Sequence, residues 1–243
     1  MASAAKSKTD IKVIILGDTN VGKTCLIQRY LTGEFAETVT SIGASLALKK
    51  WGEWNIALWD TAGEEKYASL SSFYCRGAHV AILAIDLTKK SSLEKLEQVF
   101  IPLLEEQAPT CFTVVVGTKL DLINSKGREI GSSEGKSLAV RQHQRQLERA
   151  LRSNPNTFLV KVQSHESYFE TSSKTGAGVT DLFQYIERIV LIQLQKSGVT
   201  PGGGDSSEKN RRGSSRARPD STIRLDNPPP ASTQPSQSGC CKN

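Results

Sequence analysis

Short apolar runs alternate along the chain with longer stretches in which apolar residues recur at helical spacing. The runs that predict β-strands lie at residues 11–16, 44–49, 55–59, 80–86, 112–117 and 168–170. The helical patterns lie at residues 23–31, 91–106, part of 134–153, and 179–195. Strands that alternate with helices are typical of a parallel sheet that is covered by helices on both faces. The pattern therefore predicts an α/β fold with a mostly parallel, six-stranded sheet.

Residues 17–24 read Gly-Asp-Thr-Asn-Val-Gly-Lys-Thr and lie between the first predicted strand and the first predicted helix. Gly17 and Gly22 leave room for backbone N–H groups to face a polyphosphate, and the following helix adds the positive end of its dipole. Lys23 would pair with the β- and γ-phosphates, and the Thr24 hydroxyl can ligate Mg²⁺. A glycine-containing turn that matches by chance is the alternative, which the Lys-Thr ending disfavours. The residues of this stretch that are expected to bind the nucleotide are Gly17, Asn20, Val21, Gly22, Lys23, Thr24 and Cys25.

A second candidate element is the stretch WDTAG at residues 59–63, where a predicted strand ends. Asp60 would help to hold Mg²⁺, usually through a water molecule. Gly63 has no Cβ, so its backbone N–H could approach a γ-phosphate. The alternative is an ordinary strand end at which the Asp caps the next helix.

Two further polar stretches follow predicted strands. Thr118, Lys119 and Asp121 come after the strand at residues 112–117. A carboxylate at the carboxyl edge of the sheet can accept hydrogen bonds from the N1–H and 2-amino groups of guanine, and adenine has no such donor pair. The stretch Glu-Thr-Ser-Ser-Lys at residues 170–174 follows the last strand, and its backbone N–H groups could meet guanine O6. Each stretch alone could also be a capped strand end.

These four stretches, in this order and spacing, resemble the small GTPases of the Ras superfamily over residues 11–194. Within the superfamily the chain resembles a Rab, because it has Ser-Ile-Gly at residues 41–43, WDTAGEE at 59–65, YCRGA at 74–78 and a Cys-Cys pair near its end. Residues 51–63 together with 71–78 are most similar to the Rab-twenty subgroup. The resemblance implies the P-loop NTPase fold in its small-GTPase form.

The resemblance also implies site residues. Mg²⁺ would be held by Thr24, Ser41 and Asp60, and the guanine base by Phe35, Thr118, Lys119, Asp121, Ser172, Ser173 and Lys174. The catalytic residues would be Lys23, Gly63 and Glu64. Most Rabs carry Gln where this chain has Glu64, Asn where it has Thr118, and Thr where it has Ser41. Leu46 replaces an aromatic residue of the usual effector surface, of which Trp59 and Tyr74 hold the other places.

Composition and charge indicate whether the chain enters a membrane or the secretory pathway, and what its basic tail binds. No apolar run approaches the length of a membrane span, the first residues contain no secretory signal, and Ala2 excludes N-myristoylation. Three cysteines, Cys25, Cys75 and Cys111, have no metal-binding spacing and are expected to be reduced. The net charge is +6, and residues 196–243 supply +4 of it, with eight Lys or Arg against four Asp or Glu. A basic tail without interleaved aromatic residues favours an acidic membrane surface over nucleic acid.

We expect a disordered N-terminus at residues 1–9, a GTPase domain at 10–195 with a basic insert near 125–163, and a flexible tail at 196–243. By resemblance, Cys240 and Cys241 would both be geranylgeranylated, since one lipid chain anchors only weakly. The insert carries Arg141, Arg145, Arg149 and Arg152 on one predicted helix face. That face is either simply solvated or a patch for a partner or acidic lipid.

The resemblance implies a monomeric switch that binds GTP or GDP with Mg²⁺, hydrolyses GTP and recruits effectors in vesicle or endosomal trafficking. Its partners would be an exchange factor, a GTPase-activating protein, an escort or GDI-type chaperone, and effectors, with no nucleic acid. We expect it on the cytoplasmic face of endosomal, phagosomal or Golgi membranes, with a cytosolic pool. Two alternatives are a GTP-bound scaffold with deficient hydrolysis, which Glu64 favours, and a P-loop kinase, which the guanine motifs disfavour.

Overall fold

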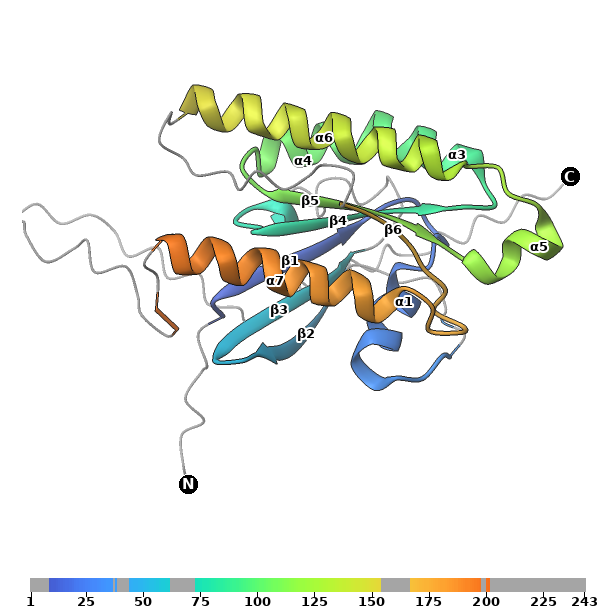
Figure 1. Cartoon of the computed structure of the whole chain (residues 1–243), viewed down its shortest axis with the longest axis horizontal. Helices are drawn as coiled ribbons and strands as arrows, with labels where there is room; N and C mark the ends of the chain where they lie inside the picture. The colour runs from blue at the N-terminus through green and yellow to red at the C-terminus, as the bar shows by residue number, and fades with distance from the viewer. Residues whose placement is uncertain are drawn as a thin grey trace, which may run out of the picture. The chain divides into compact units, whose positions relative to one another are not determined.

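The computed structural model describes residues 9–36, 38, 44–61, 73–153, 167–197 and 200–201. Its centre is a six-stranded sheet with the strand order β2-β3-β1-β4-β5-β6 (Figure 1). The strands are β1 (Ile11–Leu16), β2 (Ala44–Trp51), β3 (Trp54–Thr61), β4 (Val80–Asp86), β5 (Phe112–Thr118) and β6 (Tyr168–Glu170). Only β2 and β3 pair in the antiparallel direction, and every other neighbouring pair is parallel. The predicted α/β fold with a mostly parallel sheet is confirmed.

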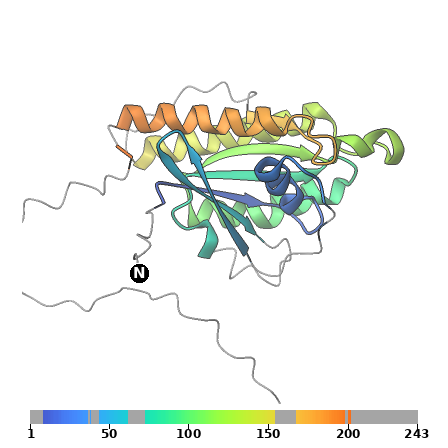
Figure 2. The same ribbon diagram turned by 90° about the horizontal axis from the view of Figure 1, so that it is seen from below.

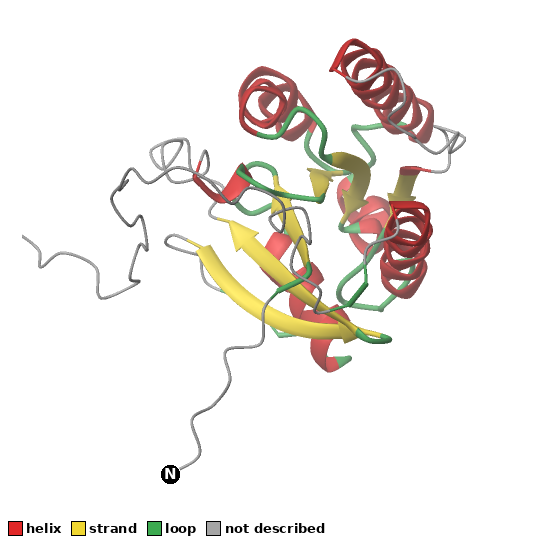
Figure 3. Ribbon diagram, turned by 90° about the vertical axis from the view of Figure 1, so that its left-hand side faces the viewer, coloured by secondary structure: helices red, strands yellow, loops and turns green. Residues whose placement is uncertain are grey.

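Helices cover both faces of the sheet. They are α1 (Lys23–Thr32), α3 (Lys90–Lys95), α4 (Ile101–Gln107), α5 (Ile123–Lys126), α6 (Ser132–Ser153) and α7 (Val179–Ser197). Helices α1 and α7 lie on one face, and α3, α4 and α6 lie on the other (Figure 1). Figure 3 shows helices on both sides of the sheet. Each face has its own apolar core, with Leu26 and Phe183 in the first and Leu93 and Leu138 in the second. Every residue of β4 and β5 is buried, as expected for central parallel strands.

The helical pattern predicted at residues 91–106 is interrupted. Between α3 and α4 the chain forms a short π-helix, Leu96–Phe100. Pro102 lies in the first turn of α4 and has no N–H to donate to the carbonyl of Gln98. Widening the preceding turn relieves the clash between the proline ring and that carbonyl.

The predicted row of arginines lies on α6 and forms ion pairs with the neighbouring helices. Arg141 pairs with Glu97 at 2.6 Å, and Arg145 and Arg149 pair with Glu105 at 3.4 Å and 2.7 Å. These pairs fasten α6 to the π-helix and to α4, although each is partly exposed and contributes little to stability. Three of the four arginines are therefore engaged within the domain instead of being a wholly free basic patch.

The carboxyl ends of β1, β3, β4 and β5 meet at one edge of the sheet, next to the start of α1 (Figure 2). In open α/β sheets this edge is where ligands bind. The predicted tail falls outside the described residues except at 196–197 and 200–201, and its boundary stays a prediction. Among the described helices, none is long and apolar enough to cross a bilayer.

Candidate functional site

The loop between β1 and α1 has the backbone form that its glycines predict. Gly17 lies at φ 151°, and a Cβ at this position would collide with the carbonyl of Ala84 in β4. Gly22 lies at φ 94° in the left-handed region and immediately precedes α1, which begins at Lys23. Gly22 has no side chain to cap the helix, so the N–H groups of the first turn are available to an anion.

Lys23 folds back over this loop. Only 6% of it is exposed, and its Nζ donates to the carbonyl oxygens of Gly17 at 3.0 Å and Asp18 at 2.8 Å. Burial lowers the pKa of Lys23 to about 8, against the opposing influence of Asp60 and Asp18. The loop therefore holds a desolvated cation that a phosphate would stabilise.

Thr24 and Asp60 lie side by side although they are far apart in the sequence. The Thr24 hydroxyl donates to Oδ2 of Asp60 at 2.6 Å, and Asp60 is 2% exposed. A hydroxyl beside a buried carboxylate fits Mg²⁺, which takes oxygen ligands and prefers few protein groups together with phosphates. The described residues contain no cluster of three or more His, Cys, Asp or Glu that could hold a metal by itself.

A cavity of about 200 Å³ opens beside the loop, and it brings the two predicted guanine motifs together. It is lined by Gly22, Cys25, Phe35, Thr118, Lys119, Asp121, Leu122, Ser173 and Lys174. Phe35 also lines this cavity, and its contact with the guanine base stays a prediction. Leu122 was not among the predicted residues, because nothing in the sequence separates it from an ordinary helix residue.

Asp121 is oriented by a residue of the second guanine motif. Oγ of Ser172 donates to Oδ1 of Asp121 at 2.6 Å. The backbones of the two motifs are also joined, since the N–H of Leu120 donates to the carbonyl of Thr171 at 3.0 Å and the N–H of Thr171 donates to Gly117 at 2.7 Å. The two stretches therefore form one rigid wall.

Thr118 connects this wall to the phosphate loop. Its hydroxyl lies 2.5 Å from the carbonyl oxygen of Val21 and 2.9 Å from that of Ile85, so one proton is shared between two acceptors. Thr118 is 2% exposed. Because Val21 belongs to the phosphate loop, the Thr118 hydroxyl joins the wall of the base cavity to that loop.

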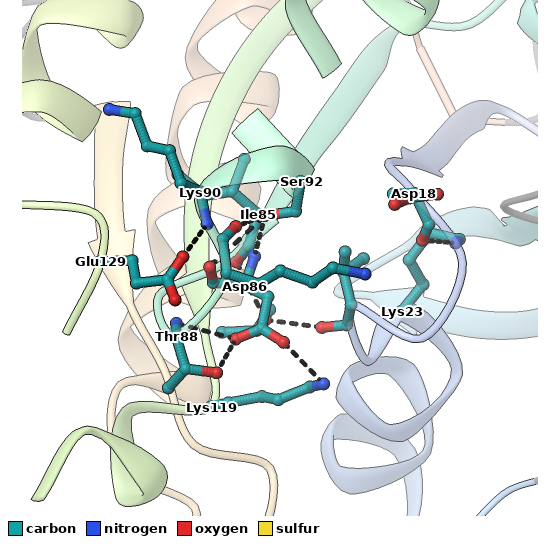
Figure 4. Close-up of polar contacts among 12 residues, drawn as sticks. Asp18, Lys23, Ile85, Asp86, Thr88, Lys90, Ser92, Lys119 and Glu129 are labelled. Atoms are coloured by element: carbon teal, nitrogen blue, oxygen red, sulfur yellow. Dashed lines mark hydrogen bonds and ion pairs between the residues drawn. The ribbon is translucent and has the colours of Figure 1, made fainter. Parts of the chain in front are cut away.

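Lys119 and Asp86 form an ion pair that the sequence analysis missed (Figure 4). Lys119 has a left-handed backbone with φ 60°, and its Nζ lies 2.7 Å from Oδ2 of Asp86. Burial would raise the pKa of Asp86, but hydrogen bonds from Lys119 and from the hydroxyl and N–H of Thr88 outweigh it and keep the pKa below its usual value. The signal was present, because Asp86 ends a buried strand at the edge where the site lies.

A second missed ion pair holds the phosphate loop itself. Nζ of Lys95, at the end of α3, lies 2.8 Å from Oδ1 of Asp18, which also accepts the N–H of Thr19 at 2.7 Å. Asn20, the next residue, has φ 58°. A non-glycine residue in that region carries strain of the kind found at ligand sites.

The remaining predicted site residues cannot be placed. Ser41, Gly63, Glu64, Cys240 and Cys241 lie outside the described residues. The structure therefore brings together the phosphate loop, Asp60 and the base wall, and the roles of Ser41, Gly63, Glu64 and the lipidation motif stay predictions.

Comparison with known proteins agrees with this geometry. The model of the Ras family matches residues 12–192, so the chain belongs to the Ras family of small GTPases, which hydrolyse GTP. Within that family it is a Rab near Rab-20. Ras-related protein Rab-20 of Mus musculus is 37% identical over 205 residues, which cover 78% of this chain and 88% of that protein.

More distant Rabs match as well. Ras-related protein Rab-24 of Dictyostelium discoideum is 36% identical over 185 residues, covering 74% of this chain and 81% of that protein. Ras-related protein Rab-36 of Homo sapiens is 30% identical over 239 residues, covering 95% and 78%. The family match excludes the kinase alternative.

Proposed function

We propose that this Rab cycles between GTP and GDP with Mg²⁺ and recruits effectors to an intracellular membrane while GTP is bound. The observation that carries the proposal is the joined site, in which Thr118 links the phosphate loop to the wall that holds Asp121. Base recognition and phosphate binding are thereby parts of one rigid surface.

Each residue of the site has a role in this cycle. Lys23 would bind the β- and γ-phosphates, and the N–H groups at the start of α1 would bind their remaining oxygens. Thr24 and Asp60 would hold Mg²⁺, which when bound neutralises charge on the phosphates. Asp121 would accept the two guanine donors while Ser172 keeps its carboxylate in place.

The proposal is tested by titrating the purified protein with fluorescent GTP, GDP and ATP analogues, with and without Mg²⁺. We expect tight, Mg²⁺-dependent binding of GTP and GDP, and ATP binding weaker by at least about 10³-fold because Asp121 would face no matching donors. Equal affinity for ATP and GTP would contradict the proposal.

A specific residue favours a slow catalytic step. Glu64 stands where an amide side chain could both accept from the attacking water and donate to the transferring phosphoryl group, whereas a carboxylate can only accept. The second candidate function is therefore a GTP-bound scaffold with deficient hydrolysis, whose state is set mainly by nucleotide exchange. A single-turnover hydrolysis assay separates the two candidates.

Glu64→Gln is expected to raise the intrinsic single-turnover hydrolysis rate by about tenfold, which needs only about 1.4 kcal/mol of relieved repulsion and regained hydrogen bonding. The matched control is Glu53→Gln, at an exposed turn between β2 and β3. A rate in Glu64→Gln that is equal to or below the wild-type rate, with GTP affinity intact, would refute this explanation.

Membrane attachment is proposed to reside in the tail. Two geranylgeranyl chains on Cys240 and Cys241 would contribute about 0.8 kcal/mol for each buried CH₂, far more than a short basic tail supplies. An exchange factor, a GTPase-activating protein, an escort or GDI-type chaperone and effectors would act on the cytoplasmic face of an endosomal, phagosomal or Golgi membrane.

The double variant Cys240→Ser with Cys241→Ser is expected to lose nearly all membrane attachment in cells. Fractionation measures it, and the matched control is Ser236→Ala with Ser238→Ala in the same tail, which should fractionate like the wild type. Membrane recovery of the double cysteine variant at the wild-type level would show that another part of the chain anchors the protein.

A further inference from the structure

The carboxylate of Glu170, immediately before the second guanine motif, accepts four hydrogen bonds. Arg128 donates through both Nη1 and Nη2 at 2.8 Å each, Ser132 Oγ donates at 2.6 Å, and the Tyr168 hydroxyl donates at 2.8 Å. The paired Arg128 contacts have the planar fork geometry in which guanidinium–carboxylate bonds are strongest. The hydrogen bonds, with that of Arg128 the largest influence, lower the pKa of Glu170 to about 2 despite its partial burial.

The donors come from two parts of the chain. Arg128 lies between α5 and α6, Ser132 begins α6, and Tyr168 belongs to the same strand as Glu170. The fourth residue of α6 is Gly135. A Cβ on Gly135 would collide with the ring of Tyr168, so the glycine lets that ring lie against α6 and direct its hydroxyl to Glu170. The side chain of Glu170 is thus held by residues 128–135 on one side and by the hydroxyl of Tyr168 on its own strand.

That segment is itself fixed to the rest of the domain. The N–H groups of Glu129 and Ile130 donate to the carbonyl of Leu87, at 2.9 Å and 3.2 Å. The backbone N–H of Lys90 donates to Oε2 of Glu129 at 2.7 Å (Figure 4), and its side chain pairs with Glu134. The contacts begin next to Asp86, which holds Lys119, so residues 128–135 are supported from the base side of the site.

The backbone of Glu170 leads directly into the base wall. Thr171 follows it and pairs with Gly117 and Leu120, and Ser172 then donates to Asp121. On the other side, a Cβ at Gly178 would collide with the carbonyl of Glu170, so the chain leaving the motif passes close against it. Little freedom remains for the motif to move unless the Glu170 side chain is released.

We propose that Arg128 and Ser132 are positioning residues that hold the guanine-binding motif through Glu170 and so set how long a bound guanine nucleotide stays. The inference rests on the proposed function, because it concerns the same site. Neither residue lines the base cavity. Their effect would reach the nucleotide only through the placement of Ser172 and Asp121.

The test is the dissociation rate of a fluorescent GDP analogue from the full chain. Arg128→Ala is expected to speed dissociation about tenfold, which corresponds to about 1.4 kcal/mol, and Ser132→Ala about threefold. Arg128→Lys should lie between the wild type and Arg128→Ala, since an ammonium cannot reproduce the two-point contact. Arg141→Ala removes an ion pair of the same kind on α6 and should change the rate less than twofold.

A second measurement separates positioning from general destabilisation. Inosine diphosphate lacks the 2-amino group, so the ratio of GDP to inosine diphosphate affinity reports how well Asp121 meets that donor. We expect this ratio to fall in Arg128→Ala and Ser132→Ala and to stay at the wild-type value in Arg141→Ala. Two outcomes would overturn the proposal. One is faster GDP dissociation with an unchanged affinity ratio. The other is a dissociation rate within twofold of the wild type in both Arg128 variants and in Ser132→Ala.

The two proposals fail in different ways. If the wild-type chain does not prefer guanine nucleotides, the proposed function is wrong. If the wild type binds GDP selectively and the variants behave like Arg141→Ala, only the positioning role is wrong. Should Arg128→Ala not fold, Ser132→Ala and Arg128→Lys give the same two readings, because each leaves part of the Glu170 network in place.

Discussion

Asp121→Asn should convert the protein from a guanine to a xanthine nucleotide binder, with a loss of GTP affinity of about 10⁴-fold. The carboxylate would accept two donors from guanine, and the amide would place its own N–H₂ group against one of them. Xanthine presents a carbonyl where guanine has the 2-amino group, so the amide donor then finds an acceptor. Competition of GTP and xanthosine triphosphate for a fluorescent nucleotide measures the exchange of preference.

The matched control for this change is Asp181→Asn, on the exposed first turn of α7. It removes the same charge from the same domain, and nucleotide preference should stay with guanine. If Asp121→Asn kept the wild-type preference for GTP over xanthosine triphosphate, Asp121 would not be the residue that reads the base. Because Ser172 donates to Asp121, Ser172→Ala should weaken GTP binding while leaving the preference for guanine.

Lys23→Met should lower the affinity for GTP and GDP by about 10³-fold or more. Methionine keeps an apolar stem of similar length, so the change removes mainly the cation that lies 6% exposed beneath the phosphate site. A charged hydrogen bond to a phosphate in such a dry environment is worth several kcal/mol. The matched control is Lys136→Met, on the exposed side of α6, and wild-type affinity in Lys23→Met would disprove the role of Lys23.

Proton uptake gives an independent check on Lys23. Its pKa of about 8 in the free protein lies below the ordinary value of 10.5, and bound phosphates would raise it again. At pH 8 about half of the free molecules lack this proton, so binding GDP should take up about half a proton. Affinity should therefore fall as the pH rises above 8. Calorimetry in buffers of different ionisation enthalpy measures the uptake, which Lys23→Met should abolish.

The sheet and the core of the site could be predicted because each depends on short stretches of sequence. Apolar runs located all six strands, and the carboxyl-edge rule placed Lys23, Asp60 and Asp121 near one another. Asp86 could have been placed at this edge by the same rule, because it ends a buried strand. Its pairing with Lys119, and that of Arg128 with Glu170, depend on which strands are neighbours, and no local pattern specifies that order. The acidic partners of the α6 arginines were missed for the same reason.

Cys25 places a thiol on the wall of the base cavity. It is the only described cysteine that is not buried, since Cys75 and Cys111 are enclosed and burial raises the pKa of both thiols. A nucleotide analogue that carries an electrophile near its base or ribose would therefore reach Cys25, and among the described cysteines the other two are buried. Such a reagent would trap the occupied form covalently, and the same thiol would report by its protection whether a nucleotide is present.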